Sequence, residues 1–220
     1  MNYTCWFSEK KAANSALVGE MGANLGRLAA DGVPVAPGFC ITVDAYGYLL
    51  KVTGLNRTIT GLVEAINFED QEDVAAKALA IRDLIEQQPI PTEIAREVLE
   101  NYFNLGRQMG LRHLEAMPVV VRSSATVEDS TQTPDKRRLA TYPNVRGGYS
   151  VLEHARHCWA SRGNTCALTD RRRQGIDHQG VKVAVVIQAM IDPHDWEPLS
   201  HTSAQNHTNL AHQSIRERLN

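Results

Sequence analysis

Two short runs of β-branched apolar residues constrain the fold of this chain more than any other feature of its sequence. One run is Pro118–Val121 and the other is Val183–Ile187. Both have the length of a strand and are too short for a helix of ordinary size. Valine and isoleucine pack well on a pleated surface, and an uninterrupted apolar run indicates a strand buried on both faces. Arg122 follows the first run directly, so a charged side chain stands at the end of a predicted buried strand.

Amphipathic helix patterns surround these two strands. Between Glu69 and Gln88 apolar residues recur every three or four positions, and Pro89 and Pro91 end the pattern. A similar pattern follows at once, so the two helices are expected to form an inserted helical hairpin. Because strands and helices alternate, the predicted fold class is α/β or α+β. The second helix of this hairpin is predicted at Ile94–Leu105. The other predicted elements are helices at Met21–Leu28, Val43–Leu50 and Leu152–Trp159, and a strand at Phe39–Thr42.

The composition permits one globular domain and gives no sign of a nucleic-acid or membrane partner. With 220 residues, 43% of them hydrophobic, the chain can bury a core. A formal charge of -2 provides no overall attraction to nucleic acid or to anionic lipid. No segment approaches the roughly 20 apolar residues that span a bilayer, and the N-terminal residues do not have the pattern of a signal peptide. A cytoplasmic protein is therefore expected.

The four cysteines are predicted to act as small apolar residues. They are Cys5, Cys40, Cys158 and Cys166, and no two of them form a CxxC pair. Such scattered positions indicate neither a zinc site nor a disulfide framework.

Beyond residue 190 the character of the sequence changes. Polar residues, prolines and histidines are frequent in this stretch, and apolar residues are few. The histidine spacings match no metal-ligand pattern of a helix or hairpin, so no metal site is predicted. We expect one domain over residues 1–190 and a polar, poorly ordered tail over residues 191–220. The histidines concerned are His194, His201, His207 and His212.

Three parts of the sequence carry a resemblance to a known family. The first combines Leu17–Gly26 with Gly32–Phe39, the second is Val121–Asp129, and the third combines Cys158–Ser161 with Arg171–His178. Here the chain resembles the phosphoenolpyruvate synthase family, whose relatives include pyruvate phosphate dikinase and the rifampicin phosphotransferases. The resemblance implies the N-terminal part of an ATP-grasp nucleotide-binding domain, with ATP as the bound nucleotide.

Arg122 is the candidate for the phosphate end of the implied site. Its guanidinium is planar, carries five donors and keeps its charge at any working pH, which suits phosphate oxygens. A structural ion pair with Glu128 or Asp129 is the alternative. The resemblance favours phosphate and implies a catalytic role for Arg122. The hydroxyls of Ser123 and Ser124 could donate to phosphate or satisfy backbone groups of a turn.

Gln188 and Met190 are the candidates for the adenine end. Gln188 follows the second buried run and resembles the family position beside the adenine, where an amide can read the polar edge of the ring. Met190 could pack on the base. The alternatives are an ordinary edge-strand glutamine and a core methionine. Gly22 matches a glycine of the family's Gly-Gly-Lys-Gly segment and completes the implied nucleotide-binding set.

The sequence departs from the family pattern where phosphate would bind. Met21 replaces the family's lysine, and Glu20 adds a negative charge beside it. The family's glycine-containing loop is replaced by Pro134–Arg138, which has a proline and long basic side chains. The Mg²⁺ ligands of the intact family, its phosphohistidine domain and its pyruvate-binding domain have no counterpart in this chain. We therefore expect ATP binding without catalysis by the chain alone, and a separate chain as the source of the missing C-terminal domains.

Three adjacent arginines, Arg171, Arg172 and Arg173, raise the alternative of a nucleic-acid site. Neighbouring residues on a helix point in different directions, so a solvated helix face is favoured and no nucleic-acid partner is predicted. His178 lies in no catalytic motif of the family and is given no functional role.

The predicted function is the ATP-binding domain of a phosphoenolpyruvate synthase-like (pyruvate, water dikinase-like) phosphotransferase that is inactive as an isolated fragment. One alternative is a rifampicin phosphotransferase-like ATP-binding domain. The other is a degenerate, non-catalytic interaction module, with exposed surface where a further lobe would pack.

Overall fold

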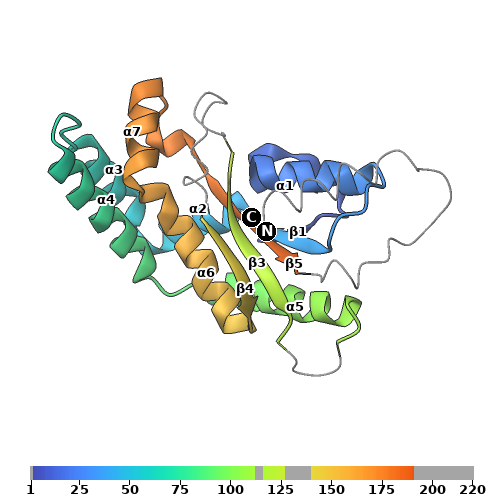
Figure 1. The fold of residues 1–220 in the computed structure, drawn as a ribbon. Helices are drawn as coiled ribbons and strands as arrows, with labels where there is room; N and C mark the ends of the chain where they lie inside the picture. Colours follow the sequence, from blue (N-terminus) through green and yellow to red (C-terminus); the bar gives the residue numbers. More distant parts are fainter. Residues whose placement is uncertain (1, 112–115, 127–139, 191–220) are drawn as a thin grey trace. The chain divides into compact units, whose positions relative to one another are not determined.

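A five-stranded antiparallel sheet organises the computed structural model, which describes residues 2–111, 116–126 and 140–190 (Figure 1). The strands follow the spatial order β1-β2-β5-β3-β4. The fold class is thus α+β, which is the second of the two predicted classes. The strands are β1 (Thr4–Trp6), β2 (Gly38–Ile41), β3 (Pro118–Ala125), β4 (Thr141–Arg146) and β5 (Val183–Ala189).

Seven α-helices and three short 3-10 helices accompany the sheet in the described part of the chain. The predicted helices and strands are all present, with ends shifted by up to six residues. Strand β3 continues to Ala125, so Arg122 lies within the strand and not at its end. The α-helices are α1 (Ser15–Ala30), α2 (Val43–Thr53), α3 (Leu55–Glu64), α4 (Gln71–Glu86), α5 (Thr92–Gln108), α6 (Gly148–Ala160) and α7 (Thr165–Gln174). The 3-10 helices are η1 (Lys10–Ala13), η3 (Ser161–Gly163) and η4 (His178–Gly180).

Strand β5 lies at the centre of the sheet. It pairs with β2 on one side and with β3 on the other, so that Ile187 lies opposite both Phe39 and Val121. Its residues are buried on both faces except Gln188, as the apolar run predicts. Strand β3 differs from the prediction, because Val119 and Val121 are buried whereas Pro118, Val120 and Arg122 are half-buried. One face of β3 is therefore only partly covered.

The two faces of the sheet are covered by different helices. Helix α6 packs on the face formed by Val121, Ile187 and their neighbours, and its Trp159 is fully buried. Helix α1 packs on the opposite face, where Val18 and Ala23 join Cys5, Cys40 and Val186 in one apolar cluster. Figure 1 shows α1 and α6 on opposite sides of the strands.

The expected helical hairpin is not confirmed. Helix α4 packs on α3 and α6, whereas α5 packs on α6 and β2, and Figure 1 shows α4 and α5 spread apart. Hydrogen bonds at the β1 edge explain the position of α5. The carboxylate of Glu97 accepts from the backbone N–H groups of Tyr3 (3.0 Å) and Thr4 (2.8 Å), which holds α5 against β1.

Several predictions fall on residues outside the described part of the chain. These are the tail at 191–220 with its histidines, the replaced loop at 134–138, and the carboxylates of Glu128 and Asp129. Among the helices at 2–111, 116–126 and 140–190, none is long and apolar enough to cross a membrane.

Candidate functional site

Two of the predicted site residues, Arg122 and Gln188, lie on the same face of the sheet. In the register of β3 and β5, Arg122 is opposite Val186 and Gln188 is opposite Val120. Opposed residues in an antiparallel pair share a face, and diagonal neighbours have Cβ atoms roughly 7 Å apart. Val186 belongs to the cluster beneath α1, so Arg122 and Gln188 both lie on the α1 face. Both are half-buried, which leaves part of each side chain accessible to a ligand.

Helix α1 is bent at Gly19, beside this face. The φ and ψ angles of Gly19 are 72° and 171°, which are not helical, and the helix resumes after it. A Cβ atom at this position would lie 2.3 Å from the carbonyl oxygen of Ser124. Only glycine fits, because the positive φ and the close approach of β3 both exclude a side chain.

The hydroxyl of Ser124 joins β3 to both sides of this bend. Its Oγ donates to the carbonyl oxygen of Val18 (2.9 Å) and accepts from the N–H of Gly22 (3.1 Å). Gly22 is also tightly packed, since a Cβ there would lie 2.8 Å from the Sγ of Cys40. The amide of Gly22 is therefore engaged inside the protein, and its place in the site is that of a close-packing residue.

Ser123 lies on the face opposite to Arg122. Successive residues of a strand point to alternate faces, and Ser123 is buried at 3% exposure. Its Oγ accepts from the N–H of Ala140 (2.9 Å), and its own N–H donates to the carbonyl oxygen of Ala140 (2.9 Å). Of the two roles considered for this hydroxyl, the structure shows the one that satisfies backbone.

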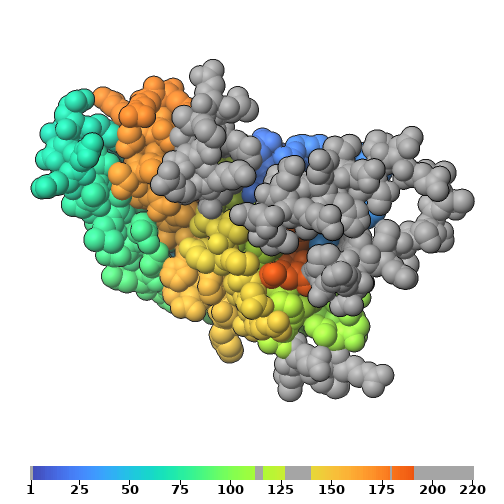
Figure 2. All heavy atoms as spheres, viewed as in Figure 1, coloured from blue at the N-terminus to red at the C-terminus, as the bar shows by residue number. Residues whose placement is uncertain are grey.

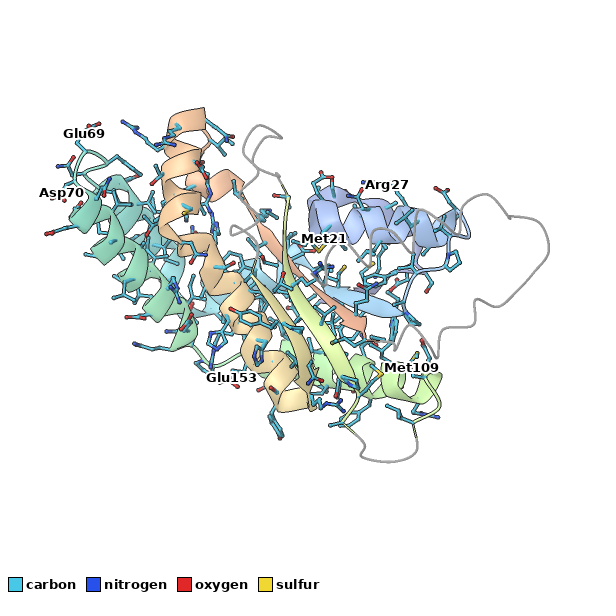
Figure 3. The ribbon with its side chains drawn as sticks, in the orientation of Figure 1. Met21, Arg27, Glu69, Asp70, Met109 and Glu153 are labelled. Carbon is cyan, nitrogen blue, oxygen red and sulfur yellow. The ribbon has the colours of Figure 1, made fainter. Side chains whose placement is uncertain are left out.

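Residues 20 and 21 follow the bend, where the sequence departs from the family. Met21 is half-buried and packs against the apolar cluster of the α1 face; Figure 3 shows it at the end of α1 that lies beside the strands. The carboxylate of Glu20 lies 3.9 Å from the guanidinium of Arg27, and about a third of the Glu20 side chain and half of the Arg27 side chain are exposed. This pairing offsets part of the negative charge that Glu20 places near the site.

The adenine candidates lie at the end of β5. Gln188 is on the central strand rather than an edge strand, and its Nε2 donates to the carbonyl oxygen of Ala36 (3.2 Å). Met190 is 38% exposed, so it is not a core methionine. Its Sδ accepts from the N–H of Asn144 in β4 (2.9 Å). In Figure 2 the end of β5, in orange-red, reaches the surface beside β4, in yellow.

A buried cluster of Arg162, Arg171 and His178 was not anticipated from the sequence. The guanidinium of Arg171 contacts Nδ1 of His178 and donates to the carbonyl oxygen of Arg162 (2.7 Å). Arg162 donates to the carbonyl oxygen of His178 and to the hydroxyl of Tyr46 (3.3 Å). Burial, together with the charges of Arg162 and Arg171, lowers the pKa of His178 to about 2. This cluster connects α7 and η4 with η3 and, through Tyr46, with α2.

The three adjacent arginines therefore do not form one basic surface. Arg172 and Arg173 are exposed, as a solvated helix face predicts, and Arg172 lies over the ring of Phe68 at 5.6 Å. For Arg171 that prediction is wrong, because only 5% of it is exposed. Its acceptors come from η3 and η4, and no local sequence pattern shows that these elements meet.

Neither Arg122 nor Gln188 lines either of two surface cavities in the described part of the chain. One surface cavity of about 500 Å³ lies beside Trp6 and Arg107, and another of about 470 Å³ beside Phe68 and Arg172. In the part of the chain that the structure describes, no three His, Cys, Asp or Glu side chains are placed to hold a metal ion.

Comparison with known proteins gives consistent matches over most of the chain. Residues 15–203 match the family described as pyruvate phosphate dikinase, AMP/ATP-binding domain. A probable phosphoenolpyruvate synthase of Methanothermobacter thermautotrophicus is 32% identical over 192 residues, which is 87% of this chain and 28% of that protein. The phosphoenolpyruvate synthase of Pyrococcus furiosus is 30% identical and aligns with 85% of this chain and 26% of its own length.

The chain is also similar to proteins named rifampicin phosphotransferase. A rifampicin phosphotransferase of a Streptomyces species is 36% identical over 183 residues, which is 83% of this chain and 20% of that protein. The chain thus spans between a fifth and somewhat more than a quarter of the length of these three relatives.

Proposed function

Since the chain belongs to the pyruvate phosphate dikinase family of AMP/ATP-binding domains, we propose that it binds ATP on the α1 face of its sheet, as the nucleotide-binding part of a phosphoenolpyruvate synthase-like phosphotransferase. The observation that carries the proposal is the common face of Arg122 and Gln188. They come from separate segments of the chain, and both stay partly accessible.

The arrangement of this face gives the bound nucleotide a direction. Arg122 and the bend at Gly19 lie toward one end of β3, where a guanidinium and the backbone of α1 favour phosphate. Gln188 and Met190 lie toward the other end, where an amide and a thioether favour the base. The triphosphate would therefore lie at the Ser124 end and the adenine at the Met190 end. Gly22 would shape the phosphate end by close packing, and the hydroxyl of Ser123 would hold the backbone beneath it.

The larger architecture is also part of the proposal. We assign residues 1–190 to the N-terminal part of an ATP-grasp domain, supported by the antiparallel sheet with one helix group on each face. Mg²⁺ would be held largely by the phosphates of ATP, as is usual for this cation at nucleotide sites. Phosphoryl transfer needs such a cation and further domains, so we propose that residues 1–190 bind ATP without transferring phosphate.

A second candidate concerns the acceptor of the phosphoryl group. The Streptomyces relative named rifampicin phosphotransferase is 36% identical, as similar to this chain as the phosphoenolpyruvate synthases are. Both candidates use the same nucleotide face. They differ in the acceptor, for which we propose pyruvate first and an antibiotic hydroxyl second.

A cytoplasmic location completes the proposal. Cys5, Cys40, Cys158 and Cys166 are all free thiols, which suits a reducing compartment. Burial raises the pKa of Cys5 to about 11, so its thiol stays protonated and unreactive at neutral pH.

Titration of the purified chain with Mg-ATP tests the proposal. Wild-type protein is expected to show a thermal shift at millimolar Mg-ATP. Arg122→Ala removes charge-assisted hydrogen bonds worth about 2–3 kcal/mol, so ATP binding should weaken roughly 30- to 150-fold. Arg173→Ala, at an exposed arginine away from the α1 face, should bind as the wild type does.

Arg122→Lys makes the experiment sharper, because lysine keeps the charge but not the planar fork. Its affinity should fall between those of the wild type and Arg122→Ala. Absence of any thermal shift in the wild type, or equal ATP affinity in the wild type and Arg122→Ala, would show that this face does not bind ATP.

A further inference from the structure

We infer that Ser124 is a positioning residue for the triphosphate end of the site, because its hydroxyl fixes the bend of α1 beside Arg122. The inference rests on the proposed function. It concerns a residue for which the sequence left two roles open, namely donation to phosphate or satisfaction of backbone. The hydrogen bonds of Ser124 indicate that it acts on the phosphate site through the backbone of α1.

The contacts of Ser124 resemble a helix cap supplied by a distant strand. The first N–H groups of a helix have no acceptor within the helix and are normally satisfied by a Ser, Thr, Asp or Asn just before it. Here the helix resumes after Gly19, which has no side chain. Ser124 takes over the role from 102 residues away in sequence, since its Oγ accepts from the N–H of Gly22 (3.1 Å).

The same hydroxyl also holds the chain before the bend. Its proton is donated to the carbonyl oxygen of Val18 (2.9 Å), so one side chain bridges both sides of Gly19. Ser124 is 1% exposed, and water therefore cannot replace these two hydrogen bonds easily. A Cβ at Gly19 would lie 2.3 Å from the Oγ of Ser124, so the bend and the strand are in close contact.

The bend is thereby fixed relative to Arg122. Arg122 and Ser124 are two residues apart on β3 and share a face, at a separation of roughly 6.6 Å along the strand. Phosphate bound by Arg122 would lie beside the backbone of residues 19–22. Without the hydroxyl, that backbone could move while Gln188 and Met190, at the other end of the face, stay in place.

A purely structural role predicts a different result. Loss of a buried hydroxyl destabilises a protein whatever its location. Ser161 provides a matched control, because it is also buried and its Oγ donates to the carbonyl oxygen of Cys158 (2.7 Å). If Ser124 acts on stability alone, Ser124→Ala and Ser161→Ala should change nucleotide binding in the same way.

The experiment compares ATP with adenosine, which lacks phosphate. Dissociation constants for both are measured on the wild type, Ser124→Ala and Ser161→Ala, at a temperature where unfolding curves show each protein to be folded. Ser124→Ala should weaken ATP about tenfold, as for one or two lost hydrogen bonds, and leave adenosine within about twofold. Ser161→Ala should leave both within about twofold.

A measurement on the wild type covers the case in which Ser124→Ala does not fold. The backbone N–H of Gly22 is followed by hydrogen exchange and NMR shift. Addition of ATP should slow its exchange and move its resonance, and addition of adenosine should do neither. Equal responses to ATP and adenosine would overturn the inference.

The outcomes separate the inference from the proposed function. If the wild type binds ATP but Ser124→Ala weakens ATP and adenosine equally, or neither, the inference is wrong and the proposed function stands. If the wild type binds no ATP, the proposed function is wrong and the inference about the triphosphate falls with it.

Discussion

The two faces of the sheet differ in how completely they are packed. On the α6 face, Val119, Val121 and Ile187 are fully buried, and α6 packs on β3 and β5. On the α1 face, Cys40, Val186 and Ser124 are buried beneath α1, but Val120, Arg122 and Gln188 are only half-buried. The same two strands, β3 and β5, supply residues to both faces in alternation, so the difference comes from the helices and from the polar side chains on the α1 face.

This difference indicates which face maintains the fold and which face is available for a ligand. A fully packed face loses dispersion contacts and gains a cavity when any side chain is shortened. A half-covered face tolerates polar groups, and its side chains can exchange water for a ligand. The proposed ATP site and the bend of α1 both lie on the less complete face.

The largest expected effect is on the free energy of unfolding, and two adjacent valines, one on each face, reveal it. Val121→Ala removes two methyl groups from the fully buried face and should lower the free energy of unfolding by about 2–3 kcal/mol. Val120→Ala makes the same chemical change on the half-buried face and should cost less than about 1 kcal/mol. Denaturant unfolding of both variants measures the difference. Equal losses would show that the two faces are packed alike.

The next effect is a pH dependence of the free energy of unfolding, which arises from His178 in the buried cluster with Arg162 and Arg171. Its pKa is lowered from 6.5 to about 2 by burial and by Arg162 and Arg171, so the folded state favours the neutral form. This contribution to stability is complete above pH 6.5 and is lost as the pH falls from 6.5 toward 2. The loss is about 1.4 kcal/mol per pH unit, or about 2 kcal/mol at pH 5.

Unfolding curves between pH 7.5 and pH 5 check this expectation. His178→Gln should be less stable than the wild type at pH 7.5 and should show a shallower loss of stability on acidification. The same slope in both proteins would mean that other groups control the acid sensitivity.

A gain of function is expected on the α1 face from Met21→Lys. The new ammonium would lie beside the bend, where the family has a lysine, and should strengthen ATP binding about tenfold, or about 1.4 kcal/mol. Met21 is half-buried, so a small loss of stability should accompany the gain. Met109→Lys, at an exposed methionine of the other helix group, is the control and should leave ATP affinity unchanged. Calorimetric titration measures both.

The smallest effect concerns Glu20. Glu20→Gln breaks an exposed pair with Arg27 and should change the free energy of unfolding by less than about 0.5 kcal/mol. ATP affinity should rise less than about threefold at low salt, and the rise should vanish at high salt because exposed charges are screened. Glu153→Gln, on the exposed surface of α6, should show no rise at either salt concentration.

Elements whose residues carry a local pattern could be predicted from the sequence. Elements that depend on pairing with distant segments of the chain could not. Helices α4 and α5 follow from their spacing and from the prolines between them. Strand β4 was not anticipated, because it contains a proline, Asn144 at φ 55°, and only one buried residue, Val145. Strand β1 has three residues and depends on pairing with β2.

The site shows the same division. The family resemblance identified Arg122 and Gln188 as candidate site residues, and the structure places them on one face of the sheet. That Arg122 and Ser123 point to opposite faces follows from the period of a strand and was within reach of the sequence. The bend at Gly19 was not, because its hydrogen-bonding partner, Ser124, lies on a strand more than 100 residues later. Burial of Arg171 likewise depends on contacts with separate elements.

The central position of β5 has a consequence for the order of folding. Strands β1 and β2 form one pair and β3 and β4 form another, and β5 is the only described strand that joins them. During synthesis the two pairs emerge from the ribosome before β5 does. Until residues 183–189 are synthesised, β2 and β3 each have an unpaired edge, and both edges then pair with β5. Cooperative folding of the sheet should therefore be a late event in translation, and nascent chains halted before residue 183 should be the forms that chaperones bind.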